Sequence, residues 1–137
     1  MLSVMIITKN EAYHLERCLQ SVAFASEVIV LDSGSTDTTV AIAKRFTSQV
    51  YAADWQGYGI QKQRALALTR HPWVLSIDAD ELVDATLQAA ILEAIASNKA
   101  DAYRIPIRLQ FQGHSLRYSG SPTRHVRLFK RAGASFT

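Results

Sequence analysis

Two aspartates one residue apart follow an apolar run in the middle of the chain. Asp78 and Asp80, with Glu81 beside them, come directly after residues 73–77, which are typical of a buried strand. In an open α/β sheet, ligands bind outside the carboxyl ends of the strands. Carboxylates at such an end are suited to hold Mg²⁺ or Mn²⁺ against phosphate oxygens. The alternative is structural, because an Asp after a strand often caps a helix or forms an Asx turn.

Asp32 is a second acid placed after an apolar run, residues 27–31, and Gly34 follows it closely. Its carboxylate can accept a hydrogen bond from a base or ribose, and Gly34 allows the backbone to approach a ligand. A capped turn is the structural alternative. The chain has neither GxGxxG after its first apolar run nor GxxxxGK[ST], so phosphates must be held by the metal and by Lys or Arg from neighbouring loops.

The elements that must position these acids alternate between strands and helices. Apolar runs predict strands at 2–8, 27–31, 49–52 and 73–77. Helical spacing predicts a helix capped by Asn10, one from Thr36 or Asp37 to about Arg45, one over 60–69 and one capped by Asp84. Strands are also expected at 103–109 and 126–129, with a polar loop at 112–123 between them. This order predicts an α/β domain whose mostly parallel sheet has helices on both faces.

Composition limits the remaining choices. The chain of 137 residues is 48% hydrophobic, which suits one domain with an ordinary core. No stretch approaches the ~18 to 20 apolar residues of a membrane span, and Lys9 and Glu11 interrupt the first run, so a cytoplasmic location is expected. The single cysteine, Cys18, excludes an internal disulfide and a cysteine-built zinc site, and it is expected to be buried and inert.

Positive charge is concentrated in the last part of the chain. From Ala102 onward there are basic residues and no acids, whereas the first 101 residues are net acidic. The basic segment is expected to meet a diphosphate, an anionic acceptor or an anionic membrane face, or to be an ordinary solvated surface. Nucleic acid is not an expected partner, since no recognition motif or aromatic stacking pattern is present. The basic residues are Arg104, Arg108, Arg117, Arg124, Arg127, Lys130 and Arg131.

Three motifs together carry a resemblance to a known family. Residues 6–11 (IITKNE), 30–37 (VLDSGSTD) and 77–81 (IDADE) resemble the nucleotide-binding half of family 2 glycosyltransferases of the GT-A fold, over most of the chain. Residues 57–64 and 127–131 are similar to the bacterial lipopolysaccharide-core branch, which includes β-glucosyltransferases of the inner core.

The resemblance implies a role for particular residues. Thr8 and Asp32 match positions that contact the nucleoside, Asp78 matches an acid on ribose or metal, and Asp80 matches the acid that ligates the metal on the diphosphate. Lys62 and Arg64 are diphosphate candidates, with a solvated helix face as the alternative, and Trp55 and Tyr58 either line the pocket or pack ordinarily.

The implied function is inverting transfer of a sugar from a nucleotide-diphosphate sugar, a UDP-sugar being favoured, to a saccharide or lipopolysaccharide-core acceptor. The implied domain is a single GT-A-like unit over 1–137, with donor and metal binding in 1–101 and the start of the acceptor side in 102–137. Contact with the inner face of the bacterial inner membrane would follow from such an acceptor. An uncovered sheet edge or apolar face would favour a homodimer.

The chain departs from the family pattern at two places. Ser33 stands where many members have a second acid, and no acid follows Asp101, although the family takes its general base from a downstream carboxylate. We therefore expect a truncated domain whose catalytic base is not identified. A non-catalytic nucleotide-sugar-binding module and another metal-dependent phosphate-handling α/β enzyme are the alternative functions.

Overall fold

The main sheet is mostly parallel. The computed structural model describes residues 1–111, 115–118 and 126–136. Four strands of the main sheet run parallel to one another, and two antiparallel strands extend the sheet at one edge. The strand order is β3 (Val50–Ala52), β2 (Glu27–Asp32), β1 (Leu2–Thr8), β4 (Trp73–Asp78), β9 (Val126–Lys130) and β6 (Ala102–Arg104). The predicted α/β fold class is confirmed.

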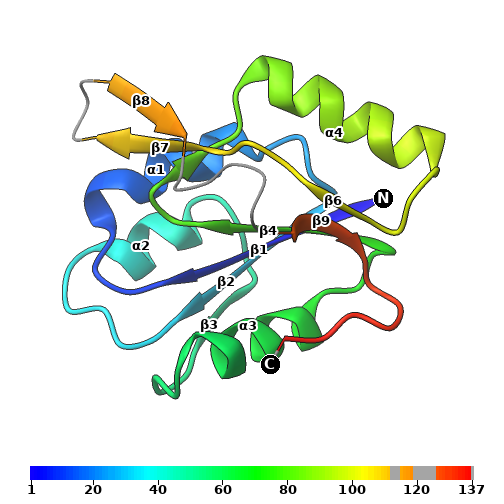
Figure 1. The fold of residues 1–137 in the computed structure, drawn as a ribbon. Helices are drawn as coiled ribbons and strands as arrows, with labels where there is room; N and C mark the ends of the chain where they lie inside the picture. The colour runs from blue at the N-terminus through cyan, green and yellow to red at the C-terminus, as the bar shows by residue number, and fades with distance from the viewer. Residues whose placement is uncertain (112–114, 119–125, 137) are drawn as a thin grey trace.

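Helices cover both faces of this sheet (Figure 1), with α1 (Ala12–Ser21), α2 (Thr39–Lys44) and α4 (Ala85–Ser97) on one face and α3 (Tyr58–Leu68) on the other. Alternate residues of a strand point to opposite faces, so Val4 and Ile6 pack in the same cluster as Leu15, whereas Met5 packs in the cluster of Leu66. Both faces of β1 are therefore buried, which explains its continuous apolar run.

A second, antiparallel sheet stands beside the first. It consists of β5 (Glu81–Leu82), β7 (Arg108–Phe111) and β8 (Ser115–Tyr118). The predicted single strand at 103–109 is wrong, because the chain leaves β6 before Pro106 and enters the second sheet as β7. Proline has no N–H for a strand ladder, which accounts for the break. The predicted loop at 112–123 is interrupted by β8, and its other residues lie outside the described ranges.

The starts of two helices are determined by single residues that precede them. Asp84 caps α4 as predicted, since its Oδ1 accepts a hydrogen bond from the Leu87 amide at 2.8 Å. Helix α3 begins at Tyr58, two residues before the predicted start, because Gly57 turns the chain with φ +99°. Only glycine adopts that backbone angle at little cost.

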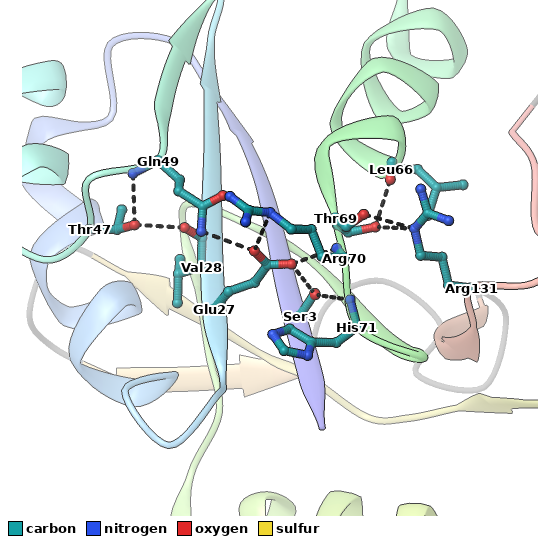
Figure 2. Close-up of polar contacts among 10 residues, drawn as sticks. All are labelled: Ser3, Glu27, Val28, Thr47, Gln49, Leu66, Thr69, Arg70, His71 and Arg131. Atoms are coloured by element: carbon teal, nitrogen blue, oxygen red, sulfur yellow. Dashed lines mark hydrogen bonds and ion pairs between the residues drawn. The ribbon is translucent and has the colours of Figure 1, made fainter.

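Glu27 joins the amino ends of the strands (Figure 2). The acid pair, Asp78 and Asp80, lies at the opposite, carboxyl ends of the strands. The Glu27 carboxylate accepts hydrogen bonds from the Ser3 hydroxyl, the Gln49 side chain at 3.0 Å and the Arg70 amide at 2.6 Å. Ser3 also accepts from the His71 amide at 3.2 Å. One buried carboxylate therefore connects β1 and β2 to the residues that precede β3 and β4.

Replacing Glu27 with glutamine is expected to lower the free energy of unfolding by about 2 kcal/mol at pH 7, since hydrogen bonds to a charged group contribute about 1.5–3 kcal/mol. Burial acts to raise the pKa of Glu27, but its hydrogen bonds outweigh burial and lower that pKa. A lowered native pKa means that this stability is present above the ordinary carboxyl pKa and is lost as the pH falls below it.

Urea unfolding at pH 7 and at pH 4 measures both effects. The E27Q variant should lose less stability than the wild type between these two pH values. Glu16→Gln is the control, because Glu16 forms an exposed pair with Arg45 and should change stability by less than about 0.5 kcal/mol. Equal losses in the two variants would contradict the role of Glu27.

Candidate active site

A cleft of about 450 Å³ opens at the carboxyl ends of β1, β2 and β4. Thr8, Asp78 and Asp80, three of the predicted site residues, line it together. The sheet order explains this meeting, because β1 pairs with both β2 and β4 in parallel and all three strands end at the same edge. The other lining residues are Ile7, Lys9, Glu11, Ser33, Trp55, Tyr58 and Ala79.

The acid pair is electrostatically unfavourable without a cation. Burial, and then the charge of Asp78, raise the pKa of Asp80. Among the described residues, no three His, Cys, Asp or Glu side chains gather closely enough to hold a metal ion by themselves. Two carboxylates facing a cleft fit Mg²⁺ or Mn²⁺, which readily share their coordination with waters and substrate phosphates. The residues present therefore fit a metal bound jointly with a phosphate-containing ligand.

The turn that carries the pair is held at its backbone. The Asp78 amide donates to Glu81 Oε1 at 2.7 Å, and the Gln110 amide donates to the Asp80 carbonyl at 2.7 Å. Cys18 lies beneath the turn, with Sγ 3.6 Å from the Asp78 carbonyl oxygen. Burial raises the pKa of this thiol well above its usual value, which agrees with the inert role predicted for Cys18.

The loops after β1 and β2 are joined to each other. The Asn10 amide donates to Ser35 Oγ at 2.7 Å, and Asn10 Oδ1 accepts from the Thr36 amide at 2.8 Å. The prediction that Asn10 caps α1 is wrong, because Glu11 occupies the cap position and Asn10 holds the neighbouring loop instead. Residues of the first two motifs thus build one wall of the cleft.

Both carboxylate oxygens of Asp32 accept hydrogen bonds from residues of its own loop. Its Oδ2 accepts from the Gly34 amide at 3.0 Å and the Ser35 amide at 2.8 Å, and Oδ1 accepts from the Ser35 hydroxyl. The residue is 3% exposed, and in the described structure Ser33 rather than Asp32 lines the cleft. These contacts are those of the capped turn, and contact of Asp32 with a nucleoside stays a prediction.

Two polar groups in the cleft are available to a ligand. Thr8 Oγ1 is buried and has no hydrogen-bond partner among the described residues. Glu11 Oε2 is also buried and has no hydrogen-bond partner among the described residues. It lies 3.4 Å from His14 Nδ1, an ion-pair distance when that histidine is protonated. Burial and the charge of Asp80 raise the pKa of Glu11. Glu11 has no role in the site predicted from the sequence, although its position three residues after a strand end was a usable signal.

The two diphosphate candidates on α3 point elsewhere. Lys62 Nζ lies 5.9 Å from the ring centre of Phe136, and Arg64 Nη1 donates to the Asp54 carbonyl at 2.9 Å. Neither lines the cleft in the described structure, whereas Lys9 does. The assignment of Lys62 and Arg64 to a diphosphate stays a prediction that these contacts do not favour.

Trp55 and Tyr58 form an aromatic pair at the far side of the cleft. Their ring centres are 4.8 Å apart with the rings perpendicular, and 48% of Trp55 is exposed. Arg64 Nη1 donates to the carbonyl and the carboxylate of the preceding Asp54, which connects this loop to α3. This loop follows β3, three strand spacings or roughly 14 Å from β4. The cleft therefore has a carboxylate end and an aromatic end.

Much of the described basic segment has partners inside the protein. Arg127 pairs with Glu81, Lys130 pairs with Asp101 at 3.1 Å, and Arg131 Nε donates to the Thr69 carbonyl at 2.8 Å. Arg124 lies outside the described residues. The predicted contact of this segment with a phosphate or a membrane thus depends on fewer free charges than the sequence suggested.

The order of strands and helices is that of an α/β domain of the GT-A type. The chain belongs to glycosyl transferase family 2, whose model matches residues 3–134. It is 39% identical over 98% of its length to an uncharacterized glycosyltransferase of Rickettsia bellii. It is 33% identical over 95% of its length to the lipopolysaccharide core biosynthesis glycosyltransferase LpsC of Rhizobium meliloti. The chain spans about half of these relatives, 48% and 51% of their lengths.

Solved structures agree with this fold. Residues 1–349 of TarS from S. aureus superimpose with a TM-score of 0.70 at 20% identity, over 96% of this chain and 47% of that TarS chain. Glucosyl-3-phosphoglycerate synthase of Mycobacterium tuberculosis, solved with Mn²⁺ and uridine-diphosphate-glucose, superimposes with a TM-score of 0.64 at 25% identity. That match covers 76% of this chain and 42% of the synthase. The resemblance inferred from the three motifs is confirmed.

Proposed function

We propose that this chain is the donor-binding part of a glycosyltransferase and binds a nucleotide-diphosphate sugar, a UDP-sugar being favoured, together with Mg²⁺ or Mn²⁺. The observation that carries the proposal is the acid pair, Asp78 and Asp80, at one end of a cleft that continues over β1 and β2 to an aromatic pair. Its span of roughly 14 Å suits an extended nucleoside diphosphate. The synthase solved with Mn²⁺ and uridine-diphosphate-glucose supports this choice of ligand.

Each end of the cleft has a distinct task in this proposal. Asp80 and Asp78 would hold the metal, which supplies Lewis-acid stabilisation of charge on the departing diphosphate. Lys9 adds positive charge at the same wall, and Thr8 Oγ1 offers an unused hydrogen-bonding group to the nucleoside. Trp55 and Tyr58 offer apolar faces at the other end.

The proposed reaction is an inverting displacement of the nucleotide by an acceptor hydroxyl. A well-placed general base contributes roughly 10²- to 10⁴-fold to such a step. Glu81 is not available for it, because its side chain is 1% exposed and paired with Arg127. The base is unassigned, which favours as second candidate a module that binds the donor without transferring it. Turnover or metal-dependent hydrolysis of the donor distinguishes the two.

We further propose a saccharide of the bacterial envelope, lipopolysaccharide core in particular, as acceptor. The relative LpsC is named for lipopolysaccharide core biosynthesis and supports this class. In this proposal residues 102–137 begin the acceptor side, and the protein works in the cytoplasm at the inner face of the membrane. Within the described part of the chain, none of the helices has the length and apolar character to cross a bilayer. Strand β6 forms one edge of the main sheet and is the proposed place for homodimer contact.

Calorimetric titration with a panel of nucleotide-sugars, first with Mn²⁺ and then with a chelator, tests the proposal. We expect one nucleotide class to bind at least tenfold more tightly with the metal, a difference of about 1.4 kcal/mol. Quenching of Trp55 fluorescence gives an independent signal, because Trp55 lines the cleft while Trp73 is buried. Failure of every donor to bind would overturn the proposed function.

A further inference from the structure

A buried ion pair lies beneath the turn that carries the two aspartates. Arg127 Nη1 is 2.7 Å from Glu81 Oε1, and Nη2 is 3.0 Å from Glu81 Oε2. The side chains are 10% and 1% exposed, respectively. Such a bidentate contact fixes the orientation of the guanidinium and the carboxylate, which a single hydrogen bond does not.

The pair contacts the backbone of β4 at two of its last three residues. Glu81 Oε1 also accepts the hydrogen bond of the Asp78 amide at 2.7 Å, and Arg127 Nη1 lies 3.3 Å from the carbonyl oxygen of Ser76. Arg127 belongs to β9, which is paired with β4 only over Trp73–Leu75. Its side chain therefore continues the connection between the two strands where their ladder stops.

We propose that Arg127 is a positioning residue for the metal, acting through Glu81 to hold the backbone at Asp78 so that the carboxylates of Asp78 and Asp80 converge on the cleft. This inference rests on the proposed binding of a metal and a nucleotide. Arg127 is hydrogen-bonded to Glu81 and acts on the two aspartates only through it. The turn that carries the aspartates is thus held at two points, by Glu81 with Arg127 and by the Gln110 amide, which donates to the Asp80 carbonyl.

The energetics of buried ion pairs point to geometry as the contribution of this pair. A buried ion pair seldom stabilises a fold more than apolar residues of the same volume. A fixed orientation of the acid-bearing turn is what an apolar pair could not supply.

The test compares Arg127→Met and Arg127→Lys with the wild type, using hydrogen exchange of the metal-free protein and Mn²⁺ affinity measured by electron paramagnetic resonance with UDP present. In R127M we expect exchange of the Asp78 amide to accelerate at least about tenfold relative to amides of β1. We expect Mn²⁺ affinity to fall about 10- to 100-fold, the usual effect of removing a group that orients a metal ligand. R127K should recover only part of both, because an ammonium lacks the planar fork.

Arg131→Met is the matched control. Arg131 follows β9 and donates to the Thr69 carbonyl and hydroxyl away from the cleft (Figure 2), so its loss should leave Asp78 exchange and Mn²⁺ affinity unchanged. Unchanged Asp78 exchange in R127M, or an increase shared uniformly with β1, would overturn the positioning role. Normal Mn²⁺ binding by R127M would overturn it as well. Absence of Mn²⁺ binding by the wild type would instead overturn the proposed function, and the metal role of Arg127 with it.

Discussion

Replacing Asp80 with asparagine is expected to remove the metal-dependent part of nucleotide-sugar binding. Asn keeps the shape of the side chain but removes the carboxylate charge of Asp80 from the cleft. We expect affinity in the presence of Mn²⁺ to fall at least about 100-fold, or about 2.8 kcal/mol, while affinity in the presence of a chelator stays the same. Calorimetry of the variant under both conditions measures the difference.

The same substitution should act in the opposite direction on stability. Burial and Asp78 raise the pKa of Asp80, so the charged form is unfavourable in the metal-free protein. D80N should therefore unfold at a higher urea concentration than the wild type without metal. Asp101→Asn is the control, because Asp101 is an exposed partner of Lys130 and should change neither measurement appreciably. Unchanged metal-dependent affinity in D80N would rule out Asp80 as a ligand.

Replacing Asp32 with alanine is expected to weaken nucleotide binding with or without metal. The substitution leaves the amides of Gly34 and Ser35 without their acceptor, which lets the loop beside the cleft move. We expect the free energy of unfolding to fall by about 3–6 kcal/mol, since two hydrogen bonds to a charged group are lost and each contributes about 1.5–3 kcal/mol. Nucleotide affinity should fall at least about tenfold, or 1.4 kcal/mol, by calorimetry.

Asp32→Asn separates the two roles considered for this residue. Asn retains an oxygen that can accept from the loop amides, so D32N should keep most of the stability and most of the affinity. A variant that keeps stability but binds as weakly as D32A would show instead that the carboxylate contacts the nucleoside. In either case the loss of nucleotide affinity in D32A should persist with a chelator present, whereas the loss in D80N should not, and this difference distinguishes the two residues.

The regular elements could be predicted because their signals are local. The runs that form β1, β2 and β4 are apolar on both faces, and short polar segments separate them from amphipathic helices. Strand β5 has only two residues, too few for any periodicity to appear. Residues 103–109 are divided between two sheets because β6 pairs with β9 and β7 pairs with β5, and both partners are distant in the sequence. Pro106 alone was not enough to predict this division.

The sequence by itself determined the fold class and the place of Asp78 and Asp80, because a strand end at the carboxyl edge of a parallel sheet follows from alternation and from where an apolar run stops. Tertiary structure alone decided the long-range contacts of the other polar side chains. Arg127 meets Glu81 across 46 residues, Asn10 meets Thr36 across 26, and Arg64 turns to Asp54. Such contacts depend on strand register and on side-chain direction, and neither is encoded in the spacing of residues within one segment.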